Sequence, residues 1–145
     1  MNTQFLKFRT KYLLGFITAF SLGIGAPALW AQEDKGGAAK AWATIQQSVK
    51  EMGTAVQSKN LHGIHDPSMK IRAPIRALKG HSSMLSGDKG QKISAALKQL
   101  DSSVTDLHSA ADEGDQAKSE AALKSVESAF DELKAEDPET AFKGM

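Results

Sequence analysis

Cysteine is absent from the 145 residues, aromatic residues make up only 6%, and there are four prolines. The absence of cysteine excludes a disulfide framework, a thiolate metal site, a cysteine nucleophile and covalent haem attachment through Cys-x-x-Cys-His. The length is that of one domain, which a conventional packed core must hold together.

Catalytic motifs are also missing. The sequence has no Ser-His-Asp spacing, no Glu-x-x-His pair on a helix and no glycine-rich phosphate loop. An acidic run at Asp112, Glu113 and Asp115 is typical of a solvated turn with helix-capping carboxylates. We therefore expect no enzymatic activity.

The N-terminus has the pattern of a secretory signal. Lys7, Arg9 and Lys11 form a basic region without an acidic residue, and an uncharged run follows from Tyr12 to Gln32. Glycines and Pro27 interrupt the run before it reaches the ~20 apolar residues that a spanning helix needs. A cleaved signal peptide at 1–31 fits better than an uncleaved membrane anchor, which remains the alternative.

Cleavage after Ala31 is preferred, and cleavage after Ala28 is the alternative. Either form leaves 15 basic residues against 17 acidic ones, a formal charge of −2 for the chain from residue 32 onward. Because such a surface lacks a basic stripe, we expect no nucleic acid partner, and no membrane partner after cleavage. The chain is therefore predicted to be exported.

Three segments show apolar residues at alternating spacings of three and four, the period of an amphipathic helix. The first starts near Ala38, after a flexible leader at 32–37, the second starts after Gly90 and ends before Gly114, and the third ends at Asp137-Pro138. Their stripes are Trp42, Ile45, Val49, Met52 and Val56; Ile93, Leu97, Leu100, Val104, Leu107 and Ala111; and Ala122 or Leu123, Val126, Phe130 and Leu133.

A fourth apolar stripe at 59–79 is interrupted by Gly63, Pro67 and Pro74. We predict one kinked helix here. The alternative is that Asp66 caps a helix that begins at Pro67, which would leave residues 60–65 in a loop. The serine- and glycine-rich stretch between Lys79 and Gly90 is typical of a mobile connection.

Four amphipathic helices of this length can bury their stripes only against one another. The predicted fold is therefore all-α, an up-down-up-down four-helix bundle at 38–137, followed by a C-terminal tail at 138–145.

A candidate metal site lies on the interrupted segment. His62, His65 and Met69 fall within about a 60° arc of one helix face, provided that the helix continues through Pro67. Imidazole and thioether ligands suit a soft or borderline ion, and copper fits best. The alternative is that the two histidines are partly exposed amphipathic residues that pack their ring edges beside the apolar stripe.

Three other residues have structural explanations. His108 lies near the C-terminal end of its predicted helix, where an imidazolium would be stabilised by the helix dipole. Arg72 would pair with a carboxylate on a neighbouring helix, at Asp101, Asp106 or Asp131. For non-covalent haem, only Met52 with His108 could supply the ligands, and we predict no such group.

The segment from Leu61 to Arg72 resembles small exported helical proteins of proteobacteria, many of unassigned function, that occur among heavy-metal and copper resistance proteins. Their pattern is Leu-x-x-x-His-x-x-Ala-x-x-Ile-Arg, and the matching residues are Leu61, His65, Ile71 and Arg72. Ser68 departs from it, because the pattern has alanine there. The resemblance implies a periplasmic helical bundle with a link to metal stress.

Two functions compete. The first is a periplasmic binding module that holds a metal ion, copper most plausibly, through His62, His65 and Met69. The second is a metal-free structural or protein-interaction protein of the periplasm, whose partner is another periplasmic protein.

Overall fold

The computed structural model describes residues 37–143, and these are helical without any strand. The predicted signal peptide at 1–31 and nearly all of the leader lie outside the described residues. In the described part of the chain, no helix is both long enough and apolar enough to cross a membrane. The all-α prediction is confirmed, and the arrangement is roughly consistent with a four-helix bundle.

Helix α1 (Gly37–Gln57) buries the predicted stripe and begins within one residue of the predicted start. Two residues after its end stands Lys59, whose φ of 56° is left-handed. The backbone N–H of Lys59 donates to Val56 O (3.0 Å) and that of Asn60 donates to Ala55 O (2.9 Å). These two bonds form the Schellman motif that closes many helices, here without the usual glycine.

The interrupted segment follows a helical path. A 3₁₀ turn, η1 (Leu61–Ile64), leads into α2 (His65–Lys70) and then α3 (Arg72–Ser82). Ile64 and Ile71, at the two junctions, both have right-handed helical dihedrals. The prolines cause the breaks because each lacks the N–H that would bond to the preceding turn. One kinked helical path is therefore observed, and Asp66 lies inside α2 and makes no side-chain cap.

The connection between α3 and α4 (Asp88–Asp112) is shorter than predicted, with only residues 83–87 outside the helices. The prediction of a loop over the whole of 79–90 was wrong. The hydroxyls of Ser82 and Ser83 donate to the carbonyls of Lys79 (2.8 Å) and Gly80 (2.6 Å), so these serines cap the last turn of α3. Gly90 is buried, and a Cβ there would lie 2.5 Å from Ser82 O, so close helix approach explains this glycine.

Helices α4 and α5 (Gln116–Ala135) form a regular hairpin. Gly114, with a φ of 70°, closes α4 by the same pair of bonds that ends α1. The Asp115 carboxylate accepts a bond from Lys118 N (2.9 Å) and caps α5. The predicted stripes of both helices are buried, except that Ala111, Ala122 and Phe130 are half-buried at the edge of the core.

The predicted tail at 138–145 contains one more helical turn, α6 (Pro138–Ala141). Asp137 caps it by accepting a bond from Thr140 N (3.3 Å), and this bond lowers the pKa of the Asp137 carboxyl. Phe142 is buried in the core, where its ring lies edge-on to His81 with centroids 6.2 Å apart. These residues are therefore part of the domain.

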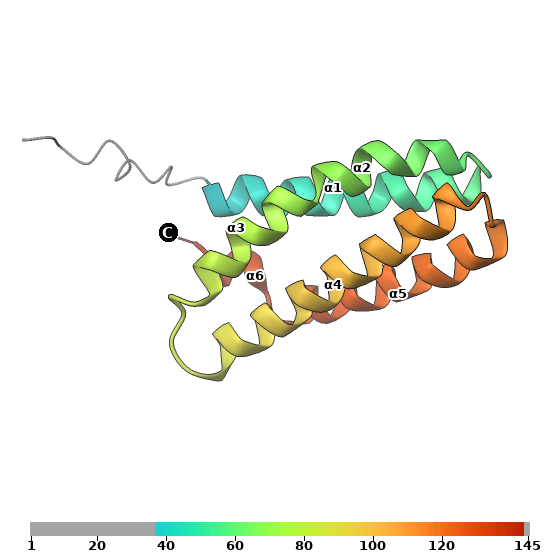
Figure 1. Cartoon of the computed structure of the whole chain (residues 1–145). Coiled ribbons are helices and arrows are strands. Elements are labelled where there is room, and N and C mark those ends of the chain that lie inside the picture. Colours follow the sequence, from blue (N-terminus) through green and yellow to red (C-terminus); the bar gives the residue numbers. More distant parts are fainter. Residues whose placement is uncertain (1–36, 144–145) are drawn as a thin grey trace, which may run out of the picture. The chain divides into compact units, whose positions relative to one another are not determined.

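Helices α1, α3, α4 and α5 share one core, to which Ile64 and Phe142 also belong. Figure 1 shows α1 alongside α2 and α3, and α4 alongside α5. Trp42 of α1 stacks on Phe130 of α5 with ring centroids 5.5 Å apart. Segments η1 and α2 also contact α4, and this contact positions the candidate site.

Candidate metal centre

His108 is the centre of the site. It stands one turn before the end of α4, beside the buried Leu107, and its side chain is 17% exposed. Asp112 lies four residues later on the same helix face, and its Oδ2 is 3.3 Å from His108 Nε2. Asp112 is thus the polar neighbour of Nε2, whereas the other ring nitrogen of His108, Nδ1, faces α2.

Helix α2 supplies the other side of the site. The ring of His65, the first residue of α2, lies with its centroid 5.0 Å from that of His108. Ser68 is fully buried, and its Oγ is 2.9 Å from His108 Nδ1. The same hydroxyl lies 2.7 Å from the backbone carbonyl oxygen of His65. One turn of α2 therefore provides both an imidazole and the hydroxyl that contacts the neighbouring imidazole.

The three side chains His65, His108 and Asp112 each offer one ligand atom, and these atoms lie within 4.8 Å of one another. Two ligand atoms that are each ~2.0–2.1 Å from a tetrahedral metal ion lie ~3.3–3.4 Å apart. The 3.3 Å between Nε2 and Oδ2 matches that edge. His65 is exposed, so its ring can rotate toward the pair at little cost.

The nearby cation Lys118 pairs with other carboxylates, which leaves the Asp112 carboxylate available to bind a metal ion. Glu113, the next residue, is held by Lys118, whose Nζ lies 2.7 Å from Glu113 Oε2 and 3.7 Å from Asp115 Oδ2. The hydrogen bond and the attraction of Glu113 raise the pKa of Lys118. Asp112 is 64% exposed, and the nitrogen beside its carboxylate is His108 Nε2.

The predicted ligands lie as follows. His65 belongs to the compact group, and the other two members of that group come from α4. His62 is exposed on η1, and Met69 is 50% exposed on α2, one helical turn after His65. A role for His62 and Met69 as ligands stays a prediction.

Sequence reasoning missed His108 and Asp112 as candidate ligands. Their spacing of four on one helix was a visible signal, but the helix dipole and a solvated turn accounted for each residue separately. The approach of α2 to α4 that unites them with His65 has no local signature in the sequence.

The predicted ion pair of Arg72 is not observed. Within residues 37–143, Arg72 forms no ion pair with Asp101, Asp106 or Asp131, and its buried Nε has no hydrogen-bond partner there. Asp131 lies 3.8 Å from Lys134 on its own helix instead. Proximity along α5 therefore decides the partner of Asp131.

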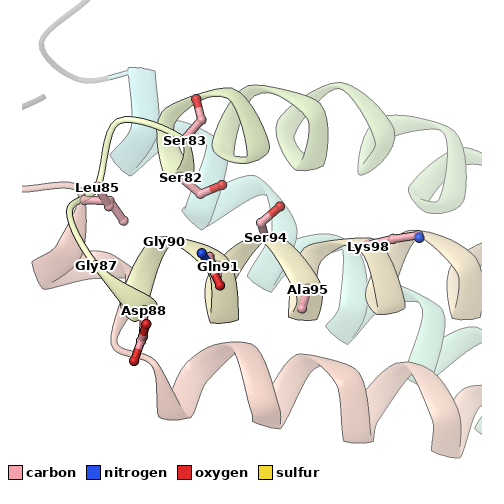
Figure 2. A pocket seen from close by; sticks show the side chains of 10 residues that line it. All are labelled: Ser82, Ser83, Leu85, Gly87, Asp88, Gly90, Gln91, Ser94, Ala95 and Lys98. Carbon is pink, nitrogen blue, oxygen red and sulfur yellow. The ribbon is translucent and has the colours of Figure 1, made fainter.

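A separate open groove lies where the end of α3 meets the start of α4. Figure 2 shows its lining, with Asp88 and Lys98 toward opposite ends. Serine hydroxyls, glycine and short side chains make up most of the rest: Ser82, Ser83, Leu85, Gly87, Gly90, Gln91, Ser94 and Ala95. The groove shares no residue with the His65–His108–Asp112 group.

Comparisons of the chain with known protein families, with curated proteins and with solved structures found no match.

Proposed function

We propose that the protein is a periplasmic binding module, an up-down-up-down four-helix bundle exported by a cleaved signal peptide, that holds a divalent metal ion at His65, His108 and Asp112. It binds its ion and does not catalyse a reaction. The observation that carries the proposal is the spacing of His108 Nε2 and Asp112 Oδ2, with the His65 ring beside them.

Copper is the metal that this donor set favours most. Two imidazoles and one carboxylate suit borderline divalent ions, and such sites bind Cu(II) more tightly than Zn(II). The resemblance of residues 61–72 to proteins of heavy-metal and copper resistance supports the same ion and a role in heavy-metal stress. Met69, one turn after His65, is in a position to add a soft ligand.

Bridging two helices gives the site a structural consequence. The ion would join α2 to α4, so its binding free energy would add to the stability of the folded state. A surface ion held by one helix alone would restrain the fold far less.

The test is a calorimetric titration of the purified exported protein with Cu(II) and with Zn(II) in a non-chelating buffer. We expect His108→Gln to weaken binding by at least ~10–100-fold, the range that loss of even an outer-shell partner costs. His62→Gln is the matched control, since it removes an exposed histidine that lies outside the group. The mass of the same preparation tests export, because cleavage after Ala31 leaves Gln32 first.

Three outcomes contradict parts of the proposal. Loss of binding in His62→Gln and Met69→Leu, but not in His108→Gln, would place the ion at His62, His65 and Met69. Equal binding by all variants would remove the site. No binding by the unaltered protein would favour the metal-free alternative, a structural or protein-interaction role with a periplasmic partner.

A further inference from the structure

The Ser68 hydroxyl contacts both a backbone carbonyl of its own helix and a histidine ring of another helix. This hydroxyl has one proton and two polar neighbours, the carbonyl oxygen of His65 at 2.7 Å and Nδ1 of His108 at 2.9 Å. A backbone carbonyl only accepts a hydrogen bond, whereas Nδ1 accepts or donates according to the tautomer of the imidazole. Because its proton bonds to the His65 carbonyl, Ser68 Oγ is placed to accept a hydrogen bond from Nδ1–H of His108.

Resting on the proposed function, we propose that Ser68 is a positioning residue that directs His108 to bind a divalent metal ion through Nε2, by accepting a hydrogen bond from Nδ1–H. The Ser68 hydroxyl donates to the His65 carbonyl oxygen at 2.7 Å, which leaves an Oγ lone pair to accept a hydrogen bond from Nδ1. With metal on Nε2, the ring proton is on Nδ1.

In that state Nδ1–H donates to Ser68 Oγ, while the Ser68 hydroxyl donates to the His65 carbonyl as it does without metal. The His65 carbonyl is essential to this arrangement, because it occupies the hydroxyl proton and leaves an Oγ lone pair for Nδ1–H.

The geometry also selects the kind of ion. Metal-bound histidines depend on a partner for the second ring nitrogen, which fixes the tautomer and ring orientation. Because Ser68 is fully buried, water does not replace it readily as that partner. The fixed Nε2 then faces a carboxylate, which together with imidazole suits Cu(II) and Zn(II) better than the monovalent Cu(I).

Ser82 provides a matched control. It is also buried, and its hydroxyl donates to the carbonyl three residues before it, at 2.8 Å, as that of Ser68 is placed to do. Its hydrogen bond involves no histidine ring. Ser82→Ala therefore removes the same backbone bond from a neighbouring helix without altering the candidate site.

The experiment measures dissociation constants of Cu(II) and Zn(II) for the unaltered protein, Ser68→Ala and Ser82→Ala. We expect a ~10–100-fold weaker constant for Ser68→Ala and no change for Ser82→Ala. Nitrogen-15 NMR of the Zn(II) form is the second readout, and it should show His108 bound through Nε2 with a slowly exchanging proton on Nδ1. In Ser68→Ala that proton should exchange rapidly.

The possible results separate the two proposals. Equal affinities for Ser68→Ala and Ser82→Ala, with His108→Gln still defective, would overturn the role of Ser68 and leave the metal site intact. Zn(II) bound through Nδ1 would do the same, and this result needs only the unaltered protein, even if Ser68→Ala fails to fold. No binding by the unaltered protein overturns both proposals.

Discussion

The regular α4–α5 hairpin and the interrupted arm at residues 61–82 contribute differently to this protein. The hairpin consists of two uninterrupted helices with a glycine turn and a capping aspartate between them. The arm needs three helical pieces to cover a comparable length because Pro67 and Pro74 break its hydrogen bonding. The helical hydrogen bonding of the hairpin is regular within each helix, whereas that of the arm is interrupted beside the candidate metal centre.

The interruption of the arm positions two of its side chains at the candidate metal centre. The break between η1 and α2 lets His65 begin a new helix, with Ser68 one turn later against His108 of the hairpin. The arm therefore supplies the imidazole and hydroxyl, and the hairpin supplies a rigid surface that presents His108 and Asp112. The comparison predicts that stability depends most on the hairpin core.

The largest expected effect is in that core. Leu97 and Leu100 of α4 are fully buried, so Leu97→Ala and Leu100→Ala should each lower the free energy of unfolding by ~2–5 kcal/mol. Ser102→Ala is the control, since Ser102 is exposed on the same helix. Denaturant unfolding measures all three, and equal small effects would show that α4 does not anchor the core.

The second prediction concerns the junction between arm and hairpin. Gly90→Ala should destabilise the protein by ~1–3 kcal/mol, because the added Cβ would lie 2.5 Å from the backbone oxygen of Ser82. Gly53→Ala is the matched control in α1, where the space around the glycine is open, and should stabilise by ~0.5–1 kcal/mol. Thermal unfolding of both variants tests this prediction. If both substitutions change the stability in the same direction, the close approach at Gly90 is contradicted.

The smallest effect compares two aspartates near helix starts. Asp115→Ala in the hairpin removes a bond to Lys118 N and should cost ~0.5–2 kcal/mol. Asp66→Ala in the arm removes no cap, because the helical path already runs through Ile64, and should change stability by less than about 0.5 kcal/mol. Urea unfolding compares them, and a larger loss for Asp66→Ala would mean that α2 starts at Asp66 as a separate helix.

Much of the fold follows from local sequence patterns. Apolar spacing located α1, α4 and α5 because an amphipathic helix needs only a 3.6-residue period and a core to face. Gly114 and Asp115 marked the hairpin turn because only certain residues tolerate a left-handed backbone or cap a helix. The serine-rich stretch was misjudged because Ser82 and Ser83 find partners in the preceding turn of α3.

The sequence by itself determined the helical character of residues 37–143, their apolar stripes and the presence of His65 on the interrupted arm. Only the tertiary structure decided that His65 and Ser68 meet His108 and Asp112. Residues 68 and 108 are far apart in the chain, and their contact depends on how α2 packs against α4. Helix periodicity specifies which face of a helix is buried, but the neighbour across that face is set by the packing of the whole core.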